Sequence, residues 1–274
     1  DLPAPLRWML LNLIILPTRP AKSAEAYRKV WGPRGSPLLY HSQDFAGALA
    51  DELGSGFRVE LGMNYGNPNV SAAYSRLIAA GVEHIVIFPL YPQLAASSTG
   101  ASLDLVYKLA TKDWCPPNFH VVEPFFDDEG FINSAVAEAR PVLEAENPDH
   151  VVFSFHGLPE RHIKKSDPSG EFCLASKDCC ASIRAENRMC YRAQAYQTAR
   201  RMAHKLTLPD GRWSVAFQSR LGRTPWIQPY TDDRLPELIK EGCKNVVVVC
   251  AAFVADCLET LEEIGMQAKE DWIA

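Results

Sequence analysis

Four of the eight cysteines lie close together in the sequence. They are Cys173, Cys179, Cys180 and Cys190, with the spacing C-x5-C-C-x9-C. Four thiolates suit a Zn²⁺ ion or a [2Fe–2S] cluster. The chain segment lacks paired C-x-x-C motifs, which argues against a zinc ribbon, and thiols that bind no metal are the third alternative. In a reducing compartment, clustered thiols favour a metal over disulfides.

A histidine follows a short apolar run. Residues Val151–Phe155 read VVFSF and lead into His156, with a Gly-Leu-Pro turn after it. Such a run predicts a strand that is covered on both faces, and ligands of open α/β sheets bind beyond the carboxyl ends of strands. An imidazole titrates near neutral pH, so it suits accepting a proton or binding a metal there. A purely structural histidine is the competing interpretation.

Three carboxylates follow the last apolar run of the chain. If residues 256–264 (DCLETLEEI) are helical, Asp256, Glu259 and Glu263 stand at i, i+3 and i+7 on one face. Stacked carboxylates repel one another, so they need solvent, protons or a cation. The pattern indicates either a solvated acidic helix start, which the helix dipole favours, or a ladder that receives a divalent ion or carries protons away.

Two more strand ends carry polar groups. The run PLYPQ (Pro89–Gln93) is followed by Ser97, Ser98, Thr99 and Gly100 at a predicted helix start. Hydroxyls and free backbone N–H groups at such a start can hold an anionic group, although plain N-capping fits equally well. The segment QSRLGRTPW (Gln218–Trp226) places two arginines after a strand. It fits either a structural turn or a clamp for a carboxylate.

Apolar, β-branched runs alternate with helix-like segments along the chain. The predicted strands are Arg58–Gly62, His84–Leu90, His120–Pro124, Val151–Phe155, Ser214–Gln218 and Asn245–Cys250. The predicted helices are Pro20–Trp31, His41–Leu53, Val70–Ala80, Ala101–Thr111, Glu129–Glu146, Cys190–Leu206 and Asp232–Glu241. This alternation is typical of βαβ units, so we predict an α/β fold with parallel sheets.

Two segments of the chain share one pattern. Gly81–Pro89 and Gly242–Cys250 each run from a helix-ending glycine through a polar turn into a buried strand. The repetition predicts two lobes, residues 1–126 and 127–274, with the cysteine segment 172–190 in the second. The remaining cysteines are scattered. We expect Cys115, Cys243 and Cys250 to be small core residues.

Composition limits the classes of function. The net charge of the 274 residues is −5 and the pI is near 5.8, which disfavours nucleic-acid binding. No signal peptide is visible, so we expect a cytoplasmic protein. Both ends look cut, because the chain opens without methionine and stops inside a predicted helix.

The longest apolar run is Trp8–Pro17 (WMLLNLIILP). It is about half the roughly 20 residues that a membrane-spanning helix needs. We expect a buried or lobe-packing helix. The alternative is a surface that meets a membrane or a flat apolar ligand, with peripheral membrane contact through residues 6–17.

Six motifs in register resemble the ferrochelatase family. They are GSPL (35–38), GMNYGNP (62–68), PLYPQ (89–93), SFHGLP (154–159), QSRLGRTPW (218–226) and DCLETLEEI (256–264). The resemblance implies two Rossmann-like lobes, each with a four-stranded parallel sheet flanked by helices, and a porphyrin cleft between them. It implies insertion of Fe²⁺ into protoporphyrin IX to form protohaem, the last step of haem biosynthesis, with release of two protons. Against the family, the chain is short at both ends.

The resemblance also assigns residues. It makes His156 the base or metal ligand and makes Glu259 and Glu263 metal-binding carboxylates, supported by Asp256. The position of Cys257 is often histidine in related enzymes. The four clustered cysteines match the [2Fe–2S] segment of some bacterial members. The substrate-binding candidates are Tyr65, Tyr91, Ser97, Thr99, Gln218, Ser219, Arg220 and Trp226, and Arg19 and Asn64 also match cleft positions.

Two other interpretations stay open. A non-catalytic porphyrin or haem carrier on the same fold would not need His156 and the acidic residues together. A chelatase for another tetrapyrrole or metal, such as coproporphyrin or cobalt, would share most of the motifs. The chemistry of the residues fits metal insertion, because imidazole and carboxylates can accept pyrrole protons and strip water from an ion.

Overall fold

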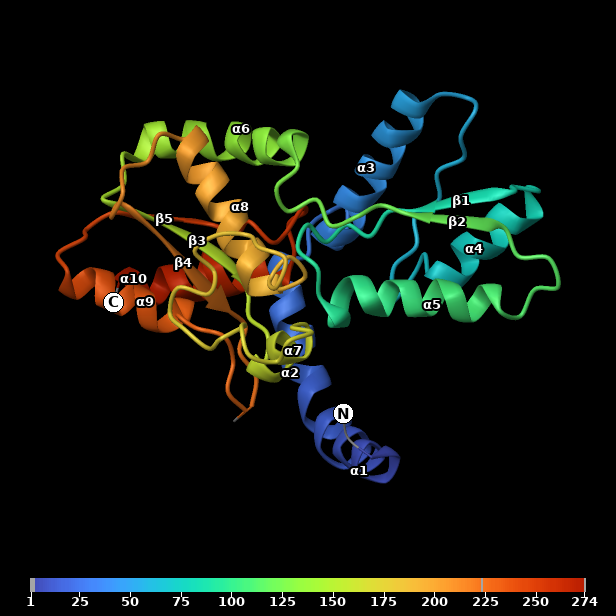
Figure 1. Ribbon diagram of the computed structural model, residues 1–274, viewed down its shortest axis with the longest axis horizontal. Helices are drawn as coiled ribbons and strands as arrows, with labels where there is room; N and C mark the ends of the chain where they lie inside the picture. The colour runs from blue at the N-terminus through green and yellow to red at the C-terminus, as the bar shows by residue number, and fades with distance from the viewer. Residues whose placement is uncertain (1–2, 223, 274) are drawn as a thin grey trace. The chain divides into compact units, whose positions relative to one another are not determined.

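The computed structural model describes residues 3–222 and 224–273 (Figure 1). Contacts divide the chain into two compact units. The helical unit contains Asp1–Phe45 and Ala255–Ala274, and the sheet unit contains Ala46–Val254. The predicted lobe boundary between residues 126 and 127 lies inside the sheet unit and stays a prediction.

A three-stranded parallel sheet forms the main core of the sheet unit. It has the order β4-β3-β5, with β3 at His150–His156, β4 at Trp213–Gln218 and β5 at Val246–Val249. The central strand is buried along its whole apolar run, and Phe153 and Phe155 are fully shielded from solvent. The register pairs His156 with Gln218. The carboxyl ends of β3 and β4 therefore meet at one edge, as the sequence predicts.

Helices cover both faces of this sheet. They are α6 (Glu129–Glu146), α8 (Tyr191–Lys205) and α9 (Thr231–Lys240), and the short helix α7 (Glu160–Lys165) follows β3 in the chain. The crossover through α8 joins β3 to β4, and the crossover through α9 returns past β3 to β5. Because crossovers are right-handed, two that run in opposite directions place their helices on opposite faces. Figure 1 shows α8 with α6 on one side of the sheet and α9 on the other.

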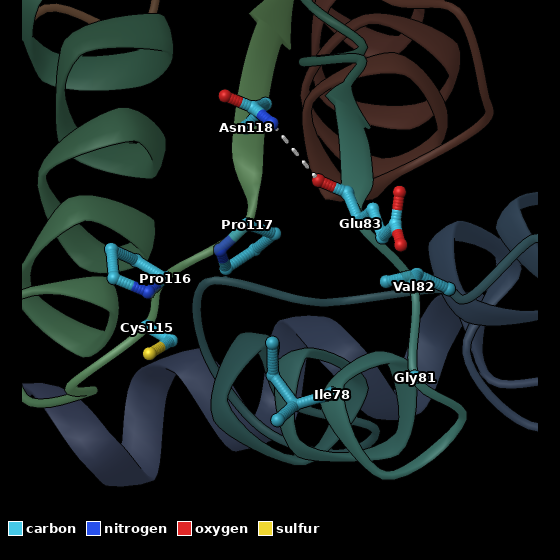
Figure 2. Close-up of a pocket in the computed structure, with 8 residues that line it drawn as sticks. All are labelled: Ile78, Gly81, Val82, Glu83, Cys115, Pro116, Pro117 and Asn118. Atoms are coloured by element: carbon cyan, nitrogen blue, oxygen red, sulfur yellow. Dashed lines mark hydrogen bonds between the residues drawn. The ribbon is translucent and has the colours of Figure 1, made fainter.

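A two-stranded parallel sheet has its own small core in the same unit. Strands β1 (His84–Ile87) and β2 (Asn118–Val121) pair, with Asn118 N donating to the Glu83 carbonyl oxygen at 2.8 Å where the ladder begins. Figure 2 shows the side chain of Asn118 donating to the same oxygen, at 3.5 Å. Helices α4 (Val70–Ala79) and α5 (Ala101–Ala110) flank the sheet. The buried apolar residues here are Tyr74, Ile85, Val106 and Ala110.

Three expectations for the sheet unit are wrong. The predicted strand Arg58–Gly62 is not a strand, because the side chains of Arg58 and Glu60 bind each other at 2.9 Å and leave little apolar surface to bury. Within the described residues, the two sheets therefore have two and three strands rather than four. Cys115 is exposed rather than part of the core, since it lies in the turn before β2 (Figure 2).

The described part of the helical unit is made of helices. They are α1 (Ala4–Met9), the π-helix η1 (Leu10–Ile15), α2 (Leu16–Val30), α3 (Pro37–Leu53, which continues into the sheet unit), the π-helix η3 (Glu259–Ala268) and α10 (Lys269–Ile273). The apolar run near the start is helical, as predicted. Its side chains are not buried, since Trp8 is 61% exposed and Leu13 60%. No helix in the described residues is long and apolar enough to cross a membrane.

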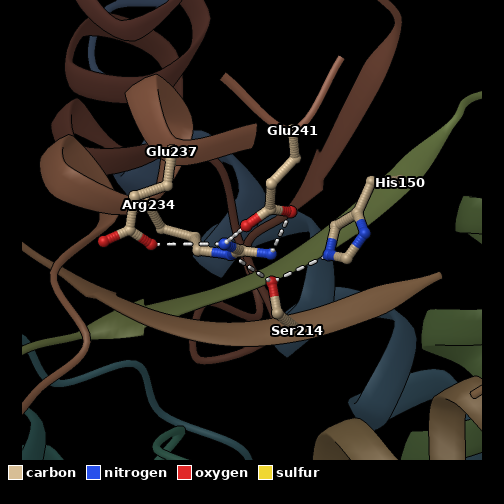
Figure 3. A network of polar contacts seen from close by, with 5 residues as sticks. All are labelled: His150, Ser214, Arg234, Glu237 and Glu241. Atoms are coloured by element: carbon tan, nitrogen blue, oxygen red, sulfur yellow. Dashed lines mark hydrogen bonds and ion pairs between the residues drawn. The ribbon is translucent and has the colours of Figure 1, made fainter. Parts of the chain in front are cut away.

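A polar network lies at the amino end of the three-stranded sheet (Figure 3). His150 Nε2 is 3.0 Å from Ser214 Oγ, and the Arg234 guanidinium donates to Glu241 at 2.7 and 3.2 Å. His150 is buried. Burial, with a smaller contribution from the nearby charge of Arg234, lowers the pKa of His150. The folded protein therefore holds this imidazole neutral.

This histidine predicts a loss of stability in mild acid. The unfolded chain takes up a proton near pH 6.5, whereas folded His150 does so only at lower pH. Below pH 6.5, the free energy of unfolding therefore falls by about 1.4 kcal/mol for each further pH unit, until the pH reaches the pKa of His150 in the folded protein. Urea unfolding at pH 7, 6 and 5 measures the effect. A His150→Gln variant should show a shallower decline, and equal slopes in the two proteins would contradict the assignment.

Candidate active site

His156 has a defined ring orientation at the end of β3. Its Nδ1 lies 2.6 Å from the carbonyl oxygen of Gly157. A carbonyl oxygen only accepts, so Nδ1 carries the hydrogen and Nε2 of the neutral ring keeps its lone pair. The ring is half-buried, with the rings of Trp226 and Phe253 at 6.4 and 6.5 Å between centroids. Nε2 can therefore accept a proton or bind a metal without a change of tautomer.

The turn after His156 requires a glycine. Gly157 N donates to the Gln218 carbonyl oxygen at 2.7 Å. A Cβ at this position would lie 2.8 Å from that oxygen and 3.2 Å from Cε3 of Trp226. The close approach joins the ends of β3 and β4 and brings Trp226 against the histidine.

Substituting this glycine tests how tightly the turn is built. We expect Gly157→Ala to lower the free energy of unfolding by about 1–3 kcal/mol, because the added carbon must displace backbone. The matched control is Gly47→Ala in α3, where a Cβ meets nothing within 4 Å. That change should stabilise the helix by about 0.5–1 kcal/mol. Urea denaturation measures both, and equal values for the two variants would contradict the close approach.

The residues after β4 are held by several contacts. Gln218 is buried, and its Oε1 accepts from Ser154 Oγ at 2.7 Å. Ser219 has a left-handed backbone with φ of 65°. The exposed Arg220 pairs with Asp232 at 2.7 Å and lies 4.3 Å from the ring centroid of Tyr230. Trp226 Nε1 donates to the Leu221 carbonyl oxygen at 2.9 Å. The second arginine of the motif, Arg223, lies outside the described residues.

Other predicted substrate-binding residues follow β1. Asn64 Nδ2 donates to Ser102 Oγ at 2.8 Å and contacts the Tyr91 hydroxyl at 3.4 Å. Ser97 is exposed in the π-helix η2 (Ala96–Gly100), whereas Thr99 is buried and its hydroxyl has no hydrogen-bond partner among the described residues. Tyr65 is 89% exposed. Of these two hydroxyls, the exposed one of Ser97 is better placed to meet a ligand than the buried one of Thr99.

The acidic residues belong to the helical unit. Glu259 and Glu263 are half-buried in η3. Asp256 lies before this helix and accepts from Thr260 Oγ1 at 3.0 Å. The predicted α-helical stripe of three carboxylates is therefore wrong, because Asp256 is not helical and π-helical hydrogen bonds join residues five apart.

Glu259 influences its neighbours within the helical unit. Burial, followed by the charge of Glu259, raises the pKa of Cys257 to about 12. Burial is also the main reason that the pKa of Tyr27 is raised, with Glu259 as the second cause. Cys257 is therefore a neutral thiol beside the carboxylate. This thiol therefore does not exchange protons near pH 7.

Glu262 is a carboxylate that sequence reasoning missed. It is buried, pairs with Lys29 at 2.8 Å, and accepts from Gln267 Nε2 at 2.9 and 3.0 Å. Its distant partner leaves no local signal in the sequence. Because Lys29 pairs with Glu262, this carboxylate is a poor candidate for receiving a cation.

All four clustered cysteines are buried in the sheet unit. Their exposed fractions are 7% for Cys173, 6% for Cys179, 3% for Cys180 and 1% for Cys190. The sulfurs of Cys179 and Cys180 are 3.7 Å apart, and the thiol of Cys190 contacts both Cys173 and Cys180. The Cys190 contact and burial raise the pKa of Cys180 far above its ordinary value. The four thiols thus form one buried group.

The arrangement of these thiols is not that of a closed single-ion site. Among the described residues, no three His, Cys, Asp or Glu side chains stand ready around one metal ion. A [2Fe–2S] cluster differs, because each of its two irons takes only two of the four protein ligands. In this loop each thiol lies near one or two of the others rather than all four around one point. This arrangement fits a [2Fe–2S] cluster better than a single Zn²⁺ ion.

Two polar residues fix the cysteine loop, and the sequence did not single them out. Asp167 accepts from the backbone N–H groups of Phe172 and Cys173, both at 2.8 Å, and these bonds hold the pKa of its carboxyl well below the usual range. Asn187 is buried and donates to the carbonyl oxygens of Cys179 at 2.8 Å and Ser182 at 2.9 Å. Their roles depend on loop geometry, which residue spacing does not reveal.

Two parallel sheets flanked by helices, with an imidazole at the carboxyl edge of one of them, define a chelatase-like α/β protein. The profile of the ferrochelatase family matches residues 1–274. The chain therefore belongs to the ferrochelatase family, whose enzymes insert Fe²⁺ into a porphyrin.

Similar proteins from several bacteria carry the same name. The chain is 46% identical over 274 residues to a ferrochelatase of Pseudomonas entomophila (strain L48), covering 100% of this chain and 80% of that protein. It is 44% identical over 269 residues to one of Bdellovibrio bacteriovorus, covering 98% and 79%. It is 43% identical over 273 residues to one of Coxiella burnetii (strain Dugway 5J108-111), covering 99% and 75%.

Proposed function

We propose that this ferrochelatase uses protoporphyrin IX as its porphyrin and produces protohaem. The reaction replaces two pyrrole protons with one Fe²⁺ ion, so two protons leave for each ion inserted. The observation that carries the proposal is His156, whose Nε2 is an acceptor because Nδ1 is occupied by the Gly157 carbonyl oxygen. A positioned group that accepts a proton is what this reaction requires.

His156 takes a pyrrole proton in the proposed mechanism. The Gly157 contact orients the ring, and the Tyr191 hydroxyl donates to the His156 carbonyl oxygen at 2.8 Å, which fixes the backbone beneath it. Trp226 and Phe253 limit the access of water to the imidazole. Proton transfer to a positioned side chain contributes typically about 10²–10⁴ in rate.

Glu259 and Glu263 are the proposed carboxylates for the metal and for the second proton. Oxygen ligands can replace water around Fe²⁺ before its transfer to the pyrrole nitrogens. Both side chains are half-buried in η3, so their carboxylates keep part of their surface open to an arriving ion. Asp256 supports the start of the helix through Thr260.

The propionates of the porphyrin are proposed to meet hydroxyl and cationic groups. Arg220 and Ser97 are both exposed and polar. Arg220 would exchange part of its contact with Asp232 for a propionate. The other proposed contacts are Tyr65, Tyr91, Thr99, Gln218, Ser219 and Trp226.

The four buried cysteines are proposed to hold a [2Fe–2S] cluster. Four neighbouring thiols in one loop supply the required ligand number, and the alternatives in this loop are a Zn²⁺ ion or thiols that bind no metal. When bound, the cluster supplies a one-electron centre and cross-links the loop to the start of α8. Insertion of Fe²⁺ involves no change of oxidation state, so the cluster is not needed to move electrons in that step.

A peripheral membrane contact is proposed for residues 6–17. Trp8, Leu13 and Ile14 are exposed by 58–61% on consecutive helices. Such a surface favours the interface of a bilayer. The proposed location is the cytoplasm, at the inner face of the membrane.

One assay separates the proposed substrate from its alternatives. The purified protein is mixed anaerobically with Fe²⁺ and either protoporphyrin IX or coproporphyrin, and the loss of porphyrin fluorescence is followed. We expect faster loss with protoporphyrin IX. Faster loss with coproporphyrin would contradict the proposal and identify coproporphyrin as the substrate. If the protein binds both porphyrins but inserts metal into neither, it is a non-catalytic porphyrin carrier.

A further inference from the structure

Arg192 lies against the sulfurs of two clustered cysteines. Its Nη1 is 3.2 Å from Cys180 Sγ and 3.9 Å from Cys179 Sγ. The arginine is in the first turn of α8, directly after Cys190 and the loop that carries the other three cysteines. One side of the guanidinium therefore contacts the sulfur pair.

The rest of the guanidinium is fixed. Nε and Nη2 donate to the Gln228 carbonyl oxygen at 3.3 and 3.1 Å, and Nη2 donates to the Tyr196 hydroxyl at 3.2 Å. The Cζ atom also lies 4.8 Å from the centroid of the Tyr196 ring. A side chain held on this many sides cannot swing to solvent, so the approach of Nη1 to the sulfurs is built into the fold.

The described residues place no carboxylate against the charge of Arg192. Among them, its guanidinium contacts the Gln228 carbonyl oxygen, the Tyr196 hydroxyl and the sulfurs of Cys179 and Cys180. Arginine stays protonated in proteins. Placing a half-buried cation beside neutral groups alone is costly. The sulfur pair is the position where a negative charge would offset this cost.

We propose that Arg192 is a positioning residue that supplies the counter-charge for an anionic iron–sulfur centre at Cys179 and Cys180, and that it raises the reduction potential of this centre. The inference rests on the proposed assignment of the four cysteines as cluster ligands. Hydrogen bonds to the sulfurs and the net charge around a cluster set its potential. Reduction adds one negative charge, so a nearby cation stabilises the reduced form more than the oxidised form.

Two other arginines of α8 show what distinguishes Arg192. Arg200 donates to the backbone carbonyl oxygen of Cys180 at 2.8 Å rather than to a sulfur. Arg201 instead pairs with Glu129. Arg201 therefore provides a matched control on the same helix.

The test compares Arg192→Met, Arg192→Lys and Arg201→Met in the full chain, purified anaerobically. Iron and acid-labile sulfide are counted, and the reduction potential is measured by titration of the visible absorption. We expect Arg192→Met to shift the ratio of reduced to oxidised cluster at least tenfold toward the oxidised form, which is about 59 mV for one electron. Arg192→Lys should shift it less, and Arg201→Met should match the unaltered protein.

Each outcome decides the inference. An Arg192→Met protein with full cluster content and an unaltered potential overturns the role of Arg192 but leaves the cluster assignment intact. An unaltered protein without iron and sulfide overturns both. If Arg192→Met assembles no cluster, recovery of the cluster in Arg192→Lys supports the need for a positive charge. Equal loss in both variants would show that packing, and not charge, is what Arg192 provides.

Discussion

Replacing His156 with alanine is expected to reduce the rate of porphyrin metalation by about 10²–10⁴-fold. The variant loses the Nε2 acceptor that the Gly157 contact keeps free. Porphyrin binding should change little by comparison, because the missing group acts on protons. The loss should therefore fall mainly on kcat rather than on KM for the porphyrin. Initial rates of fluorescence loss at several porphyrin concentrations give both constants.

A second histidine provides the control. His204 is exposed on α8 and has no role in the proposed mechanism. A His204→Ala variant should keep the full rate. Far-ultraviolet circular dichroism and urea midpoints check that both variants are folded. A folded His156→Ala protein with the unaltered rate would remove this histidine from the mechanism.

The second large effect is expected at Cys190. This residue is 1% exposed, and its thiol contacts those of both Cys173 and Cys180. Cys190→Ser keeps the size of the side chain but removes a soft ligand that iron–sulfur clusters require. We expect the visible absorption, the iron and the sulfide to fall to about one tenth or less of the unaltered protein. The melting temperature should fall as well, because a group that binds only the folded state stabilises it.

Cys243 is the matched control for that experiment. It is partly exposed and lies in the turn before β5, away from the cysteine loop in the sequence. Cys243→Ser should keep the colour and the iron content. A colourless unaltered protein that contains zinc would overturn the cluster assignment. Full iron and sulfide content in Cys190→Ser would remove Cys190 from the ligand set.

Much of the fold was predictable because burial leaves a local pattern. The run VVFSF predicts the central strand β3, and α6 begins and ends at the residues expected, Glu129 and Glu146. Asp128 explains the start of α6, since its side chain accepts from Phe131 N at 3.0 Å. The strand predicted at Arg58–Gly62 is wrong, because a short pattern of alternating residues does not reveal whether another strand lies near enough to pair with it.

The site was predictable only where a motif carries its own geometry. The strand end fixes His156, and close spacing brings the four cysteines into one loop. The π-helix at Glu259 was not predictable, because its hydrogen-bond register depends on packing rather than on composition. The roles of Glu262 and Arg192 depend on contacts with residues that are distant in the sequence, Lys29 and Gln228 respectively. Contacts of this kind leave no periodic signal.

Proton release during metalation tests the central claim most directly. The unaltered chain is mixed anaerobically with protoporphyrin IX and Fe²⁺ in weak buffer, and a pH indicator is read together with porphyrin fluorescence. Metal insertion predicts that two protons appear for each porphyrin whose fluorescence is lost, at a rate that depends on His156. Fluorescence changes without proton release would contradict the assignment and identify a protein that binds porphyrin but inserts no metal.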